Sequence, residues 1–243
     1  MKKLPEITLL FWIMKICATT LGETAGDLLS MTLNVGYSLS SILLLSCFFV
    51  SLGVQMWTKK YNPIVYWLVI LATSTAGTTM SDFMDRTLGL GYAMGSTILV
   101  SLLCIILFIW HRVEKSLSVA TITTKQGELF YWSAILISNT LGTALGDFLA
   151  DDSGLGFGGG ALLIGSLLAL IVAAHYWTKI SSIVLFWLAF VLTRPFGATF
   201  GDLLTKTTEK GGLGYGTIGS SLILFSMLVG LLLFTTIKER RNH

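Results

Sequence analysis

The sequence predicts an all-α integral membrane protein with eight transmembrane helices, built from four two-helix repeats. Composition is the first of the observations behind this prediction: of 243 residues, 53% are hydrophobic and 12% charged, whereas soluble domains carry roughly 25% charged residues. The mean hydropathy is +0.78. Since a span takes about 20 mostly apolar residues, eight spans leave only short connections and no soluble catalytic domain. We therefore expect that the protein is not an enzyme.

A repeated motif is the second observation. The pattern G-x-x-x-[GS]-D ends at each of four aspartates, and each aspartate lies 15 residues after a tryptophan. The tryptophans are Trp12, Trp67, Trp132 and Trp187, and the aspartates are Asp27, Asp82, Asp147 and Asp202. The tryptophans are 55, 65 and 55 residues apart, which predicts a first half at residues 1–120 and a second half at 121–243, each with two repeats.

Each copy contains two apolar runs. The first run carries the tryptophan and the motif, a glycine followed by an aromatic residue marks a bend, and the second run follows that bend. The expected helices are 6–28 and 36–57, 62–84 and 91–111, 127–149 and 157–177, and 182–204 and 215–237. The fourth copy has extra polar residues at 205–210, which we expect to face water. The run after Lys3 has the same register as the internal copies, so we expect a helix there rather than a cleaved signal peptide.

Lysine and arginine positions predict the orientation. Eleven lie on one side of the expected spans and three on the other, and the richer side is typically cytoplasmic. The first group is Lys2, Lys3, Lys59, Lys60, Arg112, Lys115, Lys125, Lys179, Lys238, Arg240 and Arg241, and the second is Arg86, Lys206 and Lys210. Both termini are therefore expected in the cytoplasm. The basic residues are not clustered on one face, so we expect no nucleic-acid partner.

Four tandem repeats, each of two transmembrane segments with a characteristic tryptophan, resemble a family of bacterial integral membrane proteins known only as a repeat of unknown function. The resemblance covers nearly the whole chain and rests on the four tryptophans and the motif aspartates. It implies a multi-pass protein in the lipid bilayer of the bacterial inner membrane. It implies no activity, so function must be argued from the residues.

The motif aspartates are the first candidates for a site. Fifteen residues of helix rise about 22 Å, which would place each carboxylate in the outer part of a hydrocarbon core about 30 Å thick. Charged groups at such depths usually face a bundle interior or a wet cavity. Repeats inserted in one orientation are related by an axis along the membrane normal, so four carboxylates could ring that axis. Oxygen ligands of this kind suit Mg²⁺, Ca²⁺ or Mn²⁺.

Positions at which the copies differ add three charged candidates. Three, seven and eleven residues after the tryptophans lie Lys15, Arg194 and Glu23, where the other copies have uncharged residues. Lys15 either extends toward the cytoplasmic surface or contributes to a polar path. Arg194, beside Pro195, is expected to pair with Asp202 or a neighbouring aspartate.

The remaining motif residues have structural interpretations. Small residues four apart let transmembrane helices approach closely, which is the role expected for Gly22, Gly26, Gly77, Ser81, Gly142, Gly146, Gly197 and Gly201. The four tryptophans are expected as anchors at the membrane interface. For the aspartates the alternative is also structural, with each carboxylate bonded to the bend or placed among lipid headgroups.

The predicted function is a secondary transporter or channel-like carrier for a small cation or other small polar solute, with a divalent metal as one candidate. Its path would be lined by the four aspartates, Glu23, Lys15 and Arg194. No cofactor is expected beyond the transported cation, and a monomer could complete the ring. The alternative is a non-transporting scaffold or an accessory subunit of a membrane complex. A transporter predicts a water-accessible cavity lined by the aspartates, and a scaffold predicts aspartates bonded to the backbone and a closed core.

Overall fold

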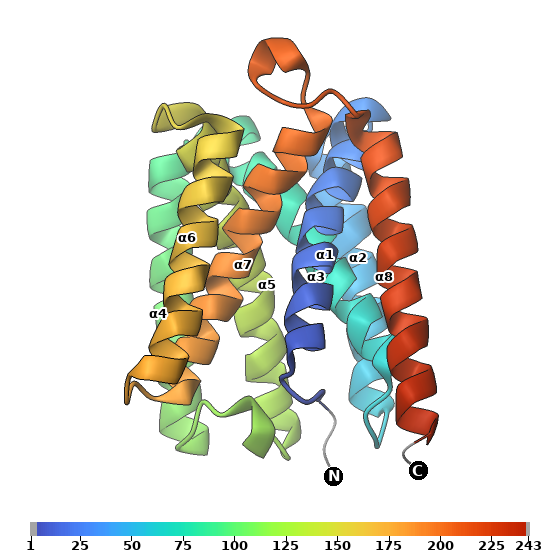
Figure 1. Cartoon of the computed structure of the whole chain (residues 1–243), viewed down its shortest axis with the longest axis vertical. Helices are drawn as coiled ribbons and strands as arrows, with labels where there is room; N and C mark the ends of the chain where they lie inside the picture. The colour runs from blue at the N-terminus through green and yellow to red at the C-terminus, as the bar shows by residue number, and fades with distance from the viewer. Residues whose placement is uncertain (1–3, 242–243) are drawn as a thin grey trace.

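The computed structural model describes residues 4–241, with side chains described as far as residue 237. These residues form a bundle of eight long helices and no strand, so the all-α prediction with two helices in each copy is confirmed (Figure 1). The helices are α1 (Leu9–Asp27), α2 (Tyr37–Trp57), α3 (Pro63–Asp82), α4 (Tyr92–Glu114), α5 (Lys125–Asp147), α6 (Gly156–Trp177), α7 (Ser182–Thr205) and α8 (Gly216–Arg241).

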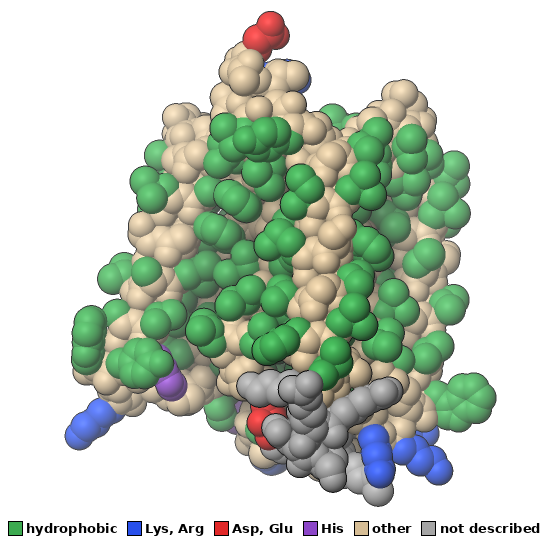
Figure 2. All heavy atoms as spheres, turned by 45° about the vertical axis from the view of Figure 1, so that its right-hand side comes forward, with side chains coloured by type: hydrophobic (Ala, Val, Ile, Leu, Met, Phe, Trp, Pro, Cys, Tyr) green, Lys and Arg blue, Asp and Glu red, His purple; other side chains and the backbone are tan. Residues whose placement is uncertain are grey.

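Seven of these helices, α2 to α8, are long and apolar enough to cross a membrane. The side wall of the bundle is covered with hydrophobic side chains, and the charged side chains visible on this face lie at its two ends (Figure 2). The structure thus has the character of a multi-pass membrane protein. Helix α1 carries Lys15, Glu23 and Asp27 within 19 residues and is not among these seven helices, so its crossing of the membrane stays a prediction.

The first helix of each copy belongs to an inner ring. Helix α1 packs against α3 and α7, and α5 packs against the same two helices. The second helices lie outside this ring: α2 covers α3, α4 covers α5, α6 covers α7, and α8 covers α1. Each outer helix therefore packs on the inner helix of the next copy, and the fourth copy closes onto the first.

Three of the inner helices begin with a polar N-cap residue. The side chains of Thr8, Asn62 and Thr124 accept hydrogen bonds from backbone N–H groups in the first turns of α1, α3 and α5, which satisfies donors that a helix start leaves free. These starts lie at the end of the bundle where the described chain begins and ends (Figure 1), called here the terminal end. Of the basic residues expected at this end, Lys2 and Lys3 lie outside the described residues, as do the side chains of Lys238, Arg240 and Arg241.

The motif aspartates end α1, α3 and α5 at the opposite end of the bundle, called here the motif end. In these three copies a five-residue π-helical turn follows, at Leu28–Thr32, Phe83–Thr87 and Phe148–Asp152. In the fourth copy α7 continues to Thr205, and the longer connection forms a 3-10 turn at Thr208–Lys210. The extra residues of that copy therefore replace the π-helical turn.

Motif glycines lie where neighbouring inner helices approach most closely. A Cβ atom on Gly22 would lie 2.2 Å from Ser74 Oγ on α3, and one on Gly142 would lie 2.3 Å from Arg194 Cγ on α7. A Cβ atom on Gly197 would lie 2.6 Å from Thr19 Oγ1, and one on Gly77 would lie 3.0 Å from Asn139 Cβ. In every case the partner lies seven residues after the tryptophan of the next copy, so these glycines set the spacing of the inner ring.

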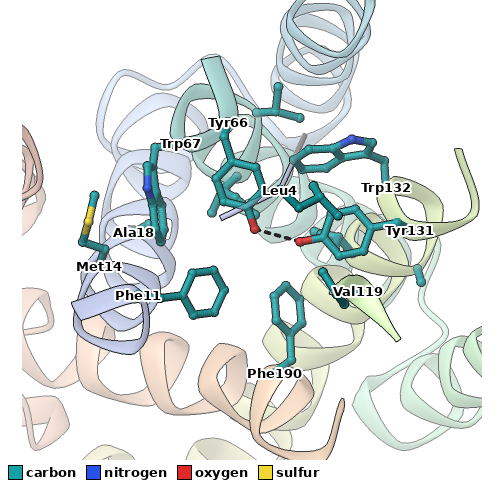
Figure 3. Packing of buried hydrophobic residues seen from close by; sticks show 14 of the residues in the cluster. Leu4, Phe11, Met14, Ala18, Tyr66, Trp67, Val119, Tyr131, Trp132 and Phe190 are labelled. Atoms are coloured by element: carbon teal, nitrogen blue, oxygen red, sulfur yellow. Dashed lines mark hydrogen bonds between the residues drawn. The ribbon is translucent and has the colours of Figure 1, made fainter. Parts of the chain in front are cut away.

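Aromatic side chains fill the terminal end of the inner ring (Figure 3). In each copy the residue before the tryptophan is also aromatic, and it contacts the tryptophan of the next copy. The pairs are Phe11–Trp67, Tyr66–Trp132, Tyr131–Trp187 and Phe186–Trp12, with ring centroids 5.6, 5.5, 6.4 and 5.7 Å apart. The hydroxyls of Tyr66 and Tyr131 are hydrogen-bonded at 2.7 Å. This set of eight residues is called the aromatic layer below.

The expectation that the four tryptophans are interface anchors needs correction for three of them. Trp67, Trp132 and Trp187 are at most 6% exposed, because the inner helices direct them into the aromatic layer. The indole of Trp187 donates to the carbonyl of Leu117, in the connection between the two halves. Exposed tryptophans are found instead at the ends of outer helices, at Trp57 and Trp177.

Candidate functional site

Positions spaced four residues apart place the charged side chains inside the inner ring. Counted from each tryptophan, positions 3, 7, 11 and 15 recur at about one helical turn and so lie on one helix face. The charged residues at these positions are Lys15, Arg194, Glu23, Asp27, Asp82, Asp147 and Asp202. None of the seven is more than 4% exposed. The structure therefore gathers every charged residue expected in the polar path within the bundle interior.

The four aspartates at the motif end are paired with two basic residues. Arg86 Nε lies 2.9 Å from Asp82 Oδ1, and its Nη2 lies 3.2 Å from Asp147 Oδ2. Lys206 Nζ lies 2.6 Å from Asp27 Oδ2 and 3.1 Å from Asp202 Oδ1. The acidic ring, meaning the four motif aspartates, is thus divided into two halves that each hold two carboxylates and one cation.

The expectation that residues 205–210 face water is wrong for Lys206. Glu209 and Lys210 are exposed, but the side chain of Lys206 turns inward and is only 19% exposed. Burial disfavours its charged form, yet the carboxylates of Asp202 and Asp27 outweigh that cost and raise the pKa of the Lys206 ammonium. The lysine therefore stays charged on the acidic ring.

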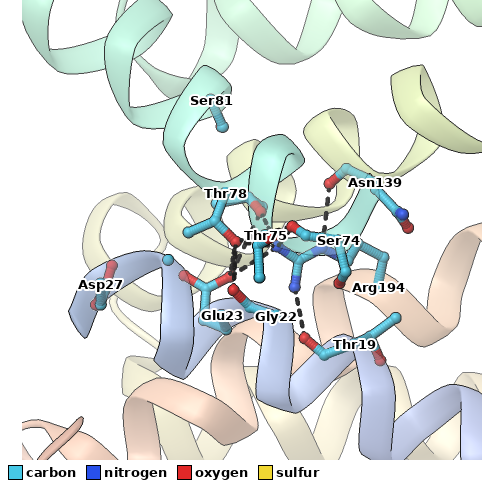
Figure 4. A network of polar contacts seen from close by, with 12 residues as sticks. Thr19, Gly22, Glu23, Asp27, Ser74, Thr75, Thr78, Ser81, Asn139 and Arg194 are labelled. Atoms are coloured by element: carbon cyan, nitrogen blue, oxygen red, sulfur yellow. Dashed lines mark hydrogen bonds and ion pairs between the residues drawn. The ribbon is translucent and has the colours of Figure 1, made fainter. Parts of the chain in front are cut away.

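One helical turn below the acidic ring, Arg194 pairs with Glu23, with 3.1 Å between Nη2 and Oε2 (Figure 4). This corrects the expected pairing with an aspartate. Arg194 lies two turns before Asp202 on its own helix, whereas the closure of α7 against α1 brings Glu23 beside it. Both side chains are buried, so each compensates the charge of the other.

The guanidinium of Arg194 also reaches every other inner helix. It donates to the backbone carbonyls of Thr19 at 2.8 Å, Ser74 at 3.2 Å and Asn139 at 3.3 Å. It donates as well to the hydroxyls of Thr78 and Thr143. One side chain from the fourth copy therefore links α7 with α1, α3 and α5 in the centre of the ring.

Lys15 lies deeper, between Arg194 and the aromatic layer. Its ammonium is 3.5 Å from Asn139 Oδ1 and 3.9 Å from the ring centroid of Phe190, and the residue is fully buried. Lys15 therefore does not extend to the membrane surface, which was one of the two expectations for it. Among the described residues its ammonium has no carboxylate within ion-pair distance, and the Phe190 ring supplies part of its stabilisation.

The interior carboxylates offer ligands for a hard cation. Oxygen atoms of Glu23, Asp147 and Asp202 lie within 4.8 Å of one another, and all three residues are buried. Carboxylate oxygens are the ligands that Mg²⁺, Ca²⁺ and Mn²⁺ prefer. This set takes two of the four motif aspartates and adds Glu23 from the layer below, so the ligands span two levels rather than one ring.

Sequence reasoning missed Arg86 and Lys206 as site residues, because it assigned both to the surface outside the spans. A signal was present, since each lies four residues after a motif aspartate, the spacing at which helical side chains of opposite charge meet. It also missed the hydroxyls of Thr78 and Thr143, although both lie eleven residues after a tryptophan, the position that Glu23 occupies in the first copy.

The fold and this interior define a multi-pass membrane protein of four tandem repeats with a buried charged core. The chain matches a repeat of unknown function (DUF347) four times, at residues 10–61, 65–116, 130–181 and 185–241, and therefore belongs to that family. Each match begins two residues before one of the four tryptophans, so the four-copy organisation is confirmed. No curated protein and no solved structure matches the chain significantly.

Proposed function

We propose that this protein is a secondary transporter, or channel-like carrier, that moves a small cation across the bacterial inner membrane, with divalent metals as the first candidates. In this proposal α1 is the eighth span, the inner ring surrounds an axis along the membrane normal, and both termini are cytoplasmic. The observation that carries the proposal is the column of charges inside the ring: the acidic ring, the Glu23–Arg194 pair and Lys15.

Helix packing alone does not explain why charged side chains lie inside the inner ring. Close approach of the inner helices needs only the small motif residues. A charged residue near the centre of a span costs about 2.5–3.5 kcal/mol on insertion scales, and such residues commonly mark ion pathways. Five acidic and four basic side chains meet in this interior. A function that uses these charges explains their cost better than a structural role does.

The structure corresponds to a closed form in this account. The carboxylates of the acidic ring are buried and ion-paired, and the aromatic layer fills the terminal end of the ring. Passage of a cation therefore requires basic side chains to exchange partners. Arg194 and Lys15 would carry the compensating charge as carboxylates load and empty.

The second candidate is a membrane scaffold or accessory subunit. It is favoured by the satisfied ion pairs, because Arg86 and Lys206 already compensate carboxylates that a transported ion would otherwise need. Each of the two basic side chains joins the aspartate four residues before it to an aspartate of another copy, so the interior could serve as a rigid core.

Cation flux into liposomes that contain the purified protein separates the two candidates. We expect uptake of at least one of Mn²⁺, Mg²⁺ and Ca²⁺ by the wild type, and at least a tenfold loss in both Asp82→Asn and Asp147→Asn, because each removes a charge from the acidic ring. Asp152→Asn, on the exposed turn after α5, is the matched control and should transport normally. Absence of uptake by the wild type, or unchanged uptake by both ring variants, would contradict transport and favour the scaffold.

A further inference from the structure

The two halves of the acidic ring hold their cations in different ways. Arg86 uses two different nitrogens for Asp82 and Asp147. Its guanidinium carbon also lies 6.0 Å from the ring centroid of Tyr37 and 5.7 Å from that of Tyr92. A planar guanidinium held by a pair of carboxylates and two aromatic rings has a fixed orientation. Arg86 is therefore held in one orientation between Asp82 and Asp147.

Lys206 is held by its ammonium alone. That single group contacts Asp27 and Asp202, with Met31 Sδ at 4.0 Å as its further neighbour. A lysine ammonium is a compact, strongly hydrated charge on a flexible stem. Exposure does not separate the two cations, since 19% of the Lys206 side chain and 33% of the Arg86 side chain are exposed. Lys206 can leave the carboxylates for water by rotating its own side chain.

The backbone beneath Lys206 stays fixed during such a rotation. The connection that follows α7 folds back on the helix end, where Gly214 N–H donates to the Lys206 carbonyl at 2.9 Å and Leu213 N–H donates to that of Leu203 at 2.7 Å. Tyr215 N–H donates to Leu204 in the same way. Release of the ammonium therefore needs no unfolding of α7 or of the connection.

Charge favours a divalent cation in place of the ammonium. Two ionised carboxylates and one ammonium leave this half of the ring with one negative charge, whereas a divalent cation would neutralise the same carboxylates fully. The oxygens of Asp202 also lie close to those of Glu23 and Asp147, so a cation arriving here finds further oxygen ligands within the bundle.

We propose that Lys206 is a tethered counter-ion, which an incoming divalent cation displaces from Asp27 and Asp202 while Arg86 remains on Asp82 and Asp147. This inference rests on the proposed function and adds to it the side on which the cation enters the ring. Lys206 then acts as an intramolecular competitor that sets the cation concentration at which the site loads.

Amine labelling of the wild-type protein in detergent tests the displacement directly. An ammonium held between two carboxylates reacts slowly with an acylating reagent, and one released into water reacts faster. We expect saturating Mn²⁺ to increase the labelling rate of Lys206 at least threefold, measured by mass spectrometry. Lys210, exposed on the same connection, is the internal control and should not change. Unchanged Lys206 labelling, while Mn²⁺ raises the unfolding temperature of the same sample, would overturn the inference and leave the proposed function standing.

Mn²⁺ affinity supplies a second test that does not depend on flux. Lys206→Gln removes the competitor, so we expect Mn²⁺ to bind at least tenfold more tightly than to the wild type, whereas Lys210→Gln should bind as the wild type does. Gain of affinity in a protein without measurable flux would support the counter-ion role and count against transport. Equal or weaker binding by the folded Lys206→Gln variant would overturn the inference.

Discussion

Replacing Arg194 with methionine is expected to cause the largest loss of stability of any single change in this protein. The substitution leaves Glu23 buried without its cation and removes the hydrogen bonds that link α7 to the other inner helices. Breaking a buried ion pair by removing one partner costs roughly 3–5 kcal/mol. The expected result is a strongly lowered unfolding temperature in detergent, or little folded protein at all.

A double variant separates the charge from the hydrogen bonds. Arg194→Met combined with Glu23→Gln removes the uncompensated carboxylate, so we expect it to be more stable than Arg194→Met alone and less stable than the wild type. A single variant that unfolds at the wild-type temperature would show that the guanidinium does not hold the inner ring together.

Replacing Gly142 with alanine is also expected to lower the stability of the protein. A Cβ atom at this position would lie 2.3 Å and 2.5 Å from Arg194 Cγ and Cβ, and 2.9 Å from Pro195 Cδ. Because these are atoms near the backbone of α7, α5 and α7 must move apart to admit it. Overpacking of this kind typically costs about 1–3 kcal/mol, to be measured as a lowered unfolding temperature in detergent.

The matched control for this change is Gly230→Ala on α8. A Cβ atom there meets nothing within 4 Å, and alanine favours a helix over glycine by about 1 kcal/mol. We therefore expect Gly230→Ala to unfold at or above the wild-type temperature. Equal unfolding temperatures for the Gly142 and Gly230 variants would contradict the close approach of α5 and α7.

The elements of the fold could be predicted because their signals are local. Apolar runs give the helices, and the fixed distance from tryptophan to aspartate gives the number of copies. Glycine spacing suggested close helix contacts as well, and the structure has such contacts at Gly22 and Gly142. The spacing does not identify the helix that each glycine contacts, because that depends on how the copies are arranged around the ring.

The pairing of the charges could not be predicted for the same reason. Arg194 was expected beside Asp202 because both lie on one helix, yet closure of the fourth copy against the first puts Glu23 nearer. Asp147 meets Arg86 only because α3 and α5 are adjacent. The inward direction of Trp132 likewise follows from the ring, since a tryptophan at a helix start also suits a membrane interface.

Cation-dependent stability tests the central claim, that the interior carboxylates bind a cation, most directly. A ligand that binds only the folded protein stabilises it by mass action, by about 2.7 kcal/mol at a concentration 100 times its Kd. Unfolding temperatures of the wild type and of Asp147→Asn would be measured in detergent with a panel of divalent and monovalent cations. The account predicts that at least one divalent cation stabilises the wild type and that the same cation fails to stabilise Asp147→Asn. No shift with any cation, or an equal shift in both proteins, would contradict it.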